Sequence, residues 1–421
     1  MTSQIKMLKA TLTACVSSLA ALSVPMAQAQ DGFTLDVSAG LDASTDKDFT
    51  AQRSGGAIGV NATLRPNYVF SDSVNFLRIG GDAQITEYFG DEPSDYTFGG
   101  SLTSQRRMSE RLTLTGNLAY SRSKRANAPA RFLSFQSNPL DNTTPGGAVP
   151  QAPSTPGVQL SDGDEAGVTD PTLLGRRVKS DRLSASVGAD YIVSARTNLN
   201  LAIGSFRSSY DLGDLEDHRG FTVDLAYQRR VSERMTIVVS PGYSNVDYDL
   251  GSKIEIIRPH LGVTIQAGSQ STFKLNAGPS FVNYDQRNGL SSNRTNFSAN
   301  ANLCQSLERG SFCVGADRGY EATARGGVRL THAANIAYLA RLGVNNSLQL
   351  VANVDRRSPD EEGLFEKSTS AGGSARYSHT IGQNLWGFAS VGYRSIWEGS
   401  LDQRDNAFVT VGISKKFGAR Q

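Results

Sequence analysis

The sequence predicts an all-β protein, a transmembrane antiparallel up-and-down β-barrel with 18 strands, or with 16 as the alternative. Three observations predict this class. Apolar and polar residues alternate with period two along most of the chain. Short and long polar connections follow one another in turn, and aromatic residues gather near both ends of the expected strands. Helical spacing of apolar residues appears nowhere at comparable length.

The first 29 residues have the order of a secretory signal peptide. Lys6 and Lys9 precede a weakly apolar stretch, which ends in a small-residue A-x-A site at Ala29. We therefore expect export and cleavage after Ala29. Residues 30–421 then form a single domain, the barrel.

The charge balance excludes several classes of protein. The chain has 421 residues with 42 Lys+Arg and 40 Asp+Glu, and removal of Lys6 and Lys9 leaves 40 of each sign. A neutral mature chain excludes a strongly basic nucleic-acid binder and an acidic disordered tail. After the signal, no apolar run is long enough to cross a bilayer as a helix.

The alternation assigns one apolar face to each expected strand, with Ser, Thr, Asn, Gly, Asp and Arg at the intervening positions. The clearest faces, in chain order, are Ile58, Val60, Ala62, Leu64, Pro66, Tyr68 and Phe70; Leu112, Leu114, Gly116, Leu118 and Tyr120; Leu183, Ala185, Val187, Ala189, Tyr191 and Val193; Phe273, Leu275, Ala277, Pro279 and Phe281; and Ala407, Val409, Val411, Ile413 and Phe417. A soluble β-sandwich alternates in the same way, so this pattern alone does not identify the environment.

The lengths of the connections favour a membrane barrel. Short turns are expected near 71–73, 108–111, 194–198, 231–234, 267–271, 305–311, 342–346 and 380–384. Longer polar connections are expected near 42–53, 89–95, 122–181, 211–219, 247–252, 285–292, 318–326, 356–366 and 397–404. Strict alternation of short and long connections is typical of outer-membrane barrels, which have short periplasmic turns and long extracellular loops. Both termini fall on the short-turn side.

Aromatic residues of the apolar faces lie at two levels, as in the interfacial girdles of a barrel. Tyr68, Phe70, Tyr227, Phe273, Tyr377 and Phe417 lie near short turns, and Tyr120, Tyr243 and Tyr393 near the long connections. We expect the barrel to be closed, because each unpaired edge group in lipid costs several kcal/mol.

One eight-residue segment occurs twice. The sequence RRMSERLT at 106–113 returns as RRVSERMT at 229–236, and each copy is followed by a Tyr-Ser pair at the same offset. A duplicated binding site would explain the repeat. A reused hairpin turn with solvated charges is the simpler interpretation.

The longest connection, residues 122–181, holds seven of the fourteen prolines. Proline has no backbone donor for a sheet, so this segment is expected outside the ladder. Two interpretations remain open: the loop folds into the lumen and constricts it, or it extends from the surface.

Two cysteines remain after removal of the signal, and they flank one short turn. By alternation, Cys304 and Cys313 both point inward and lie opposite each other across a hairpin. In the oxidising periplasm we expect a disulfide, worth about 2–3 kcal/mol for such a short loop. A metal site would need further ligands, and no histidine is adjacent.

Catalysis has little support in the sequence. His218, His260, His332 and His379 are scattered, and neither a G-x-S-x-G elbow nor a phosphate-binding loop is present. We expect no enzyme activity, no cofactor and no metal.

The lumen is the expected functional region. Polar residues whose strand positions face inward are Arg78, Asp82, Gln84, Asp224, Gln228, Arg230, Arg258, His260, Lys274, Asn276, Arg329, Asn353 and Arg376. The opposite assignment would place charges in lipid, at about 2–4 kcal/mol each near mid-membrane. A lining of mixed sign with many amides and hydroxyls suits neutral, hydroxyl-rich solutes. For any single residue, mutual pairing inside a polar interior is the simpler explanation.

The chain resembles the proteobacterial β-barrel porin 2 family. The resemblance lies in the signal peptide, the wholly β mature region, the hairpin CQSLERGSFC at 304–313, Asp317-Arg318, and the closing VTVGISKKF at 409–417. It implies an 18-stranded outer-membrane barrel, and several members are associated with exopolysaccharide export. One departure is the end of the chain, because residues 418–421 follow Phe417, whereas outer-membrane proteins commonly end on an aromatic residue that the barrel-assembly machinery reads.

Together these features predict a porin-like outer-membrane channel that conducts exopolysaccharide. A general diffusion porin for small hydrophilic solutes and a plugged structural or surface-interaction barrel are the alternatives. The expected partners are outer-membrane lipid and lipopolysaccharide, the barrel-assembly machinery and periplasmic polysaccharide-export proteins, with no nucleic acid.

Overall fold

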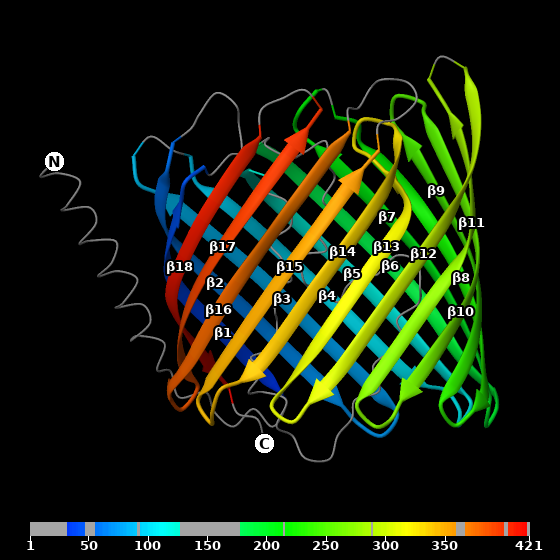
Figure 1. The fold of residues 1–421 in the computed structure, drawn as a ribbon, viewed down its shortest axis with the longest axis horizontal. Coiled ribbons are helices and arrows are strands. Elements are labelled where there is room, and N and C mark those ends of the chain that lie inside the picture. Colours follow the sequence, from blue (N-terminus) through cyan, green and yellow to red (C-terminus); the bar gives the residue numbers. More distant parts are fainter. Residues whose placement is uncertain are drawn as a thin grey trace, which may run out of the picture.

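The computed structural model describes residues 32–46, 55–90, 93–126, 177–213, 215–287, 289–358, 367–399 and 403–418. Within these ranges, 18 strands form one closed antiparallel barrel, as the sequence predicts (Figure 1). Each strand pairs with its neighbours in the chain, and the first strand pairs with the last to close the sheet. The preferred strand count of 18 is confirmed.

The strands are 12 to 18 residues long and cross the barrel obliquely (Figure 1). In chain order they are β1 (Phe33–Ser44), β2 (Ala57–Ser71), β3 (Asn75–Tyr88), β4 (Asp95–Arg107), β5 (Leu112–Ala126), β6 (Arg177–Ser194), β7 (Thr197–Tyr210), β8 (His218–Ser232), β9 (Met235–Tyr248), β10 (Lys253–Ala267), β11 (Ser271–Asp285), β12 (Ser291–Leu307), β13 (Gly310–Ala322), β14 (Val328–Arg341), β15 (Asn346–Arg357), β16 (Ser368–Gly382), β17 (Leu385–Glu398) and β18 (Arg404–Phe417).

The short turns all lie at one rim, the lower rim in Figure 1. The longest of them have four residues, 108–111 and 342–345, and several have only two. Asp72 shows how such a turn is held: its carboxylate accepts the backbone N–H groups of Val74 and Asn75 at 2.7 and 2.6 Å. The pKa of Asp72 is lowered first by a hydrogen bond from the Asn75 side-chain amide, at 3.0 Å, and then by these two backbone bonds.

Exposed apolar side chains cover the outside of the barrel. Leu118, Val187 and Val411 are exposed and lie on the faces that the sequence assigns outward, and Leu201 on β7 is exposed in the same way. The neighbouring positions on the same strands carry Asn117, Ser186, Asn200 and Thr410. An apolar outer surface with polar residues behind it is the arrangement that lipid outside and water inside require. No helix among the described residues is long and apolar enough to cross a membrane.

Several predicted connections are shorter in the structure because strands continue into them. The 305–311 turn reduces to residues 308–309, since Gln305 and Ser306 still pair with Phe312 and Ser311. The 318–326 connection reduces to 323–327. The basic start and the end of the 122–181 segment lie in β5 and β6. The structure does not describe the predicted signal peptide and its cleavage site. Residues 127–176 also lie outside the described residues, so the two predictions for this loop, inside the lumen or on the surface, stay predictions.

Candidate functional site

The candidate site is the inner wall of the barrel together with one hairpin that bends into it. The thirteen residues predicted to face the lumen all lie on described strands. Each occupies a position that alternates with the exposed apolar positions of its strand. The structure groups some of them with polar partners and leaves others on their own.

One group lies on β2 and β3. Arg65 Nε donates to Asp82 Oδ1 at 2.7 Å, so Asp82 forms an ion pair across neighbouring strands. Arg78 Nε donates to Asn67 Oδ1 at 2.9 Å. These contacts agree with mutual pairing inside a polar interior.

A second group runs across β8 to β13. Asp224, Gly242 and Arg258 occupy one cross-strand row, and the Asp224 carboxylate reaches over Gly242, with Oδ1 2.7 Å from where a Cβ of that residue would lie. Arg258 also acts electrostatically on Asp317, whose Oδ1 accepts a bond from Asn300 at 3.3 Å.

This wall also carries an imidazole, from His260, and an amide, from Asn276. His260 Nε2 lies 2.6 Å from Ser298 Oγ. Asn276 is buried beside Gly262, in register with Asn300. The wall of β8–β13 therefore mixes charges of both signs with neutral hydrogen-bonding groups.

The remaining predicted residues stand apart from these groups. Gln84, Gln228, Lys274 and Arg230 form no side-chain hydrogen bond or ion pair within the described part of the chain, and Asn353 Oδ1 is buried without a partner there. Arg376 lies over the Phe388 ring at 4.3 Å. The sequence-predicted set is thus not one constellation but a dispersed lining.

The β13–β14 hairpin leaves the barrel wall and bends inward. β12 pairs with β13 over only nine residue pairs, up to Ala299 and Arg318, whereas β11 and β12 share fifteen. β14 pairs with β15 only from Thr331 onward. Among the described residues, 319–330, which we call the inward hairpin, therefore pair with no strand of the wall on either side.

The inward hairpin lies on the inner face of β9–β11. Its Val328 belongs to a buried apolar cluster, against which Tyr320 and Ala322 pack. The wall side of this cluster consists of Val246, Tyr248, Ile254, Ile256, Val282 and Tyr284. Two of these tyrosines also bond the tip: Tyr248 Oη donates to Thr323 O at 2.8 Å, and Tyr284 Oη to Gly326 O at 2.6 Å.

The tip reaches as far as β6 and the β7–β8 connection. Ala324 is 0% exposed and packs with Val178 and Leu215 in a second small cluster. The Glu216 backbone N–H donates to Ala324 O at 2.6 Å. The hairpin consequently covers the inner wall from β6 to β11 at its long-connection end.

The opposite side of the inward hairpin is polar. Glu321 and Arg329 are direct cross-strand neighbours, and Thr331 Oγ1 donates to Glu321 at 2.9 Å. Nearby, Arg357 and Asp355 form a buried ion pair at 2.7 Å. The alternation of the strands thus continues through the bend, with the apolar side against the wall and the charged side away from it.

Gly326 has a backbone conformation and a close contact that a residue with a side chain would not accommodate without strain. Its φ is +79°, and a Cβ there would lie 2.8 Å from Glu216 Oε1. The Glu216 carboxylate is therefore against the tip, and its Oε2 is buried with no hydrogen-bond partner among the described residues. Burial raises the pKa of Glu216 above its ordinary 4.5; Arg287 opposes this rise and Asp249 adds to it.

We expect docking of the tip to depend on pH through Glu216. Because the pKa of Glu216 is higher in the docked state, the protonated carboxyl stabilises docking. This stabilisation is fully present below pH 4.5 and is lost as the pH rises through the raised pKa. Glu216→Gln should keep the tip docked more tightly at neutral pH. The measurement is thiol labelling of an Ala324→Cys reporter, taken as the ratio of the rates in the parent and in the Glu216→Gln variant at each pH. A ratio that does not change with pH would contradict the assignment, and Glu233→Gln in a distant turn is the control.

The sequence alone does not reveal this hairpin or its wall. It predicts a long connection at 318–326 and polar residues at inward positions. Alternation breaks at Ile256–Ile257, where two consecutive apolar residues place one on each face of the sheet. Val246, Ile254 and Val282 also lie on the inner face, but they indicate an apolar inner patch only when the pairing of β9, β10 and β11 is known.

Cys304 and Cys313 are joined by a disulfide in the structure. They are direct cross-strand neighbours on β12 and β13. The covalent bond thus lies on the short seam from which the inward hairpin departs, where fewer backbone bonds hold the two strands together.

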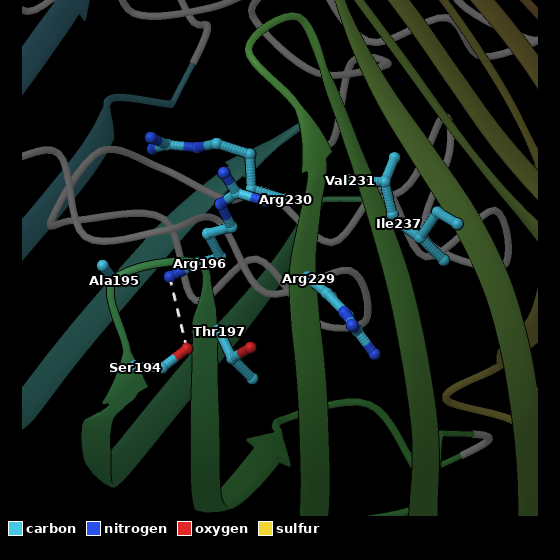
Figure 2. A pocket seen from close by; sticks show the side chains of 8 residues that line it. All are labelled: Ser194, Ala195, Arg196, Thr197, Arg229, Arg230, Val231 and Ile237. Atoms are coloured by element: carbon cyan, nitrogen blue, oxygen red, sulfur yellow. Dashed lines mark hydrogen bonds between the residues drawn. The ribbon is translucent and has the colours of Figure 1, made fainter.

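A further hollow, of about 610 Å³, lies at the short-turn rim beside the β6–β7 turn. Its lining includes Arg196, Arg229 and Arg230, and no acidic residue. Figure 2 shows Arg196 and Arg230 extending to one side of the strands and Arg229 to the other. Among the described residues, no three His, Cys, Asp or Glu side chains gather as a metal site would require.

Neither a family model nor a curated protein matches the chain. Solved structures do show similarity in fold. OpdK from Pseudomonas aeruginosa, crystallised with vanillate, has a TM-score of 0.47 and 9% identity over 91% of this chain and 99% of that chain. OccK8 (OprE) from the same organism has a TM-score of 0.45 and 10% identity, covering 93% and 98%. The FrpB iron transporter from Neisseria meningitidis has 0.48 and 7%, covering 92% and 82%.

At such TM-scores and identities these similarities add no evidence on function. The resemblance to the β-barrel porin 2 family is not shown by any matching family model, and it stays a prediction. Strand count, closure and the two faces of the wall come from the structure itself.

Proposed function

We propose that this protein is an outer-membrane channel that passes hydrophilic solutes. The observation that carries the proposal is the pair of opposite faces on one closed sheet: exposed apolar residues outside, and charges, amides and hydroxyls inside. A closed barrel satisfies every backbone group in lipid, and 18 strands enclose an interior wide enough for water. The predicted signal peptide and cleavage after Ala29 supply the route of export.

The specific task that we propose is passage of exopolysaccharide. The wall of β8–β13 offers His260, Asn276 and Ser298 beside a few charges of both signs. Such groups replace the hydration of a hydroxyl-rich chain without binding it tightly, so transport is passive and has no chemical step. The family resemblance supports the same cargo. Lipopolysaccharide, the barrel-assembly machinery and periplasmic polysaccharide-export proteins are the proposed partners.

Two other functions remain as alternatives. A general diffusion porin would use the same wall for small solutes. A structural or surface-interaction barrel with a plugged lumen is favoured by the inward hairpin, which occupies part of the inner wall.

Single-channel recording on the purified barrel in planar bilayers tests the proposal. We expect a stable conductance with weak ion selectivity, because the wall carries both signs of charge. A folded, heat-modifiable protein that never conducts would exclude both pore functions. A deletion strain then separates them: loss of secreted polysaccharide with normal nutrient uptake supports export, and the reverse supports a diffusion porin.

A further inference from the structure

The short-turn rim of the barrel carries arginines without acidic partners. Arg196 and Arg230 come from neighbouring hairpins, and the Arg230 backbone N–H donates to Arg196 O at 2.8 Å. This bond fixes the two residues beside each other, and their side chains extend to the same side (Figure 2). Neither guanidinium forms an ion pair with any described residue, and both side chains are exposed.

Strand alternation places Arg230 on the lumen side of the wall. Asp224, Ala226 and Gln228 precede it on the inner face of β8, whereas Leu225 and Tyr227 are exposed outside. Arg229 belongs to the outer face. The two adjacent arginines of this turn thus have the same charge and opposite orientations.

The repeated turn sequence gives the rim a second copy of this arrangement. In RRMSERLT at 106–113, Arg107 pairs with the inward Thr113 and corresponds to Arg230, and Arg106 corresponds to Arg229. The repeat therefore places one inward arginine at the base of β4 and another at the base of β8. Both lie at the same rim.

At the long-connection end, several charged side chains of the described residues have partners of opposite sign. Lys253 pairs with Glu255 at 2.8 Å, and Arg404 with Glu398 at 3.7 Å. Arg122 lies 3.6 Å from Asp181. Arg404 occupies an inward position of β18 and has an acidic partner, whereas the inward Arg230 at the short-turn rim has none among the described residues.

We propose that Arg196 and Arg230 form a binding site for carboxylate groups of the solute at the short-turn mouth. This inference rests on the proposed channel function and narrows its substrate to carboxylate-bearing molecules. Two neighbouring guanidinium groups without counter-charges among the described residues bind carboxylates through charge-assisted, bidentate hydrogen bonds. The same positive field collects anionic solutes at the mouth before they enter the lumen.

Binding of oligogalacturonate to the detergent-solubilised barrel, measured by titration calorimetry, tests the site without requiring conduction. We expect binding that weakens with added salt, and a loss of about tenfold or more in the Arg196→Gln/Arg230→Gln double variant, as two charge-assisted contacts are removed. Arg229→Gln is the matched control, because it removes the same charge from the other face of the same turn. It should bind like the parent.

Three outcomes would overturn the proposal: no binding to the parent, equal binding to the double variant, or an equal loss in Arg229→Gln. Bilayer recording distinguishes failure of the carboxylate site from failure of the proposed channel function. A parent that conducts but is not blocked by oligogalacturonate at either mouth rejects the carboxylate site and leaves the channel standing. A parent that binds but never conducts rejects the channel.

Discussion

Replacing Tyr248 and Tyr284 together by phenylalanine is expected to release the tip of the inward hairpin. Each hydroxyl donates to a tip carbonyl, at Thr323 and Gly326. A buried hydrogen bond contributes about 0.5–1.5 kcal/mol net, so losing both shifts the docking equilibrium by roughly tenfold or more. The apolar rings remain in place, so the barrel wall itself keeps its packing.

An Ala324→Cys reporter measures the released tip. Ala324 is 0% exposed when docked, and the other two cysteines of the described chain are joined in a disulfide. We expect slow labelling by a membrane-impermeant maleimide in the parent and labelling roughly tenfold or more faster in the Tyr248→Phe/Tyr284→Phe background. Single-channel current in the same variant shows whether tip position changes conductance.

The matched control makes the same chemical change on the other face of the barrel. Tyr120 donates to Asp181 at 2.8 Å, and both Tyr120 and Tyr393 are exposed on the outside near the long connections. Tyr120→Phe/Tyr393→Phe should leave labelling of the reporter thiol unchanged. Equal acceleration in both double variants would mean that the tip responds to overall stability rather than to its two tyrosine bonds.

The sequence predicts the barrel well because lipid allows few alternatives. Outward positions such as Leu118 and Val187 must be apolar, their neighbours face water, and closure follows from the cost of an open edge. Turn lengths then supply the strand count. The sequence predicts the strand boundaries less accurately, because residues such as Gln305 and Ser306 have the composition of a turn but still pair with the neighbouring strand.

The inner architecture could not be predicted in the same way. Ile254 and Ile256 are apolar side chains on the inner face of the wall, and they are buried because another segment covers them. Which segment covers them depends on how β13 pairs with its neighbours. Nothing in residues 319–330 alone shows that they leave the wall. Alternation predicts the inward positions one by one, but which residues meet, such as Asp82 and Arg65, depends on the register of neighbouring strands.

Placing an arginine at Val187 is expected to destabilise the barrel strongly, and this substitution tests whether the outer face contacts lipid. Val187 is 62% exposed at the middle of the outer face of β6, between Leu183 and Tyr191. Its cross-strand neighbours, Gly116 and Ile203, offer no partner for a charge. A guanidinium near mid-membrane costs about 2–4 kcal/mol, whereas on a water-exposed surface the change would be small.

The adjacent residue provides the control, because Ser186 faces the lumen. Its neighbour Gly204 leaves space there, and the one bond at stake is a 3.4 Å contact from Asn117. Ser186→Arg should therefore unfold from lipid vesicles at nearly the parent's urea concentration, and Val187→Arg at a clearly lower one. If the two variants unfold alike, the outer face does not contact lipid. The result is decisive because one step along a strand changes only the side of the wall, with charge, depth and pairing nearly constant.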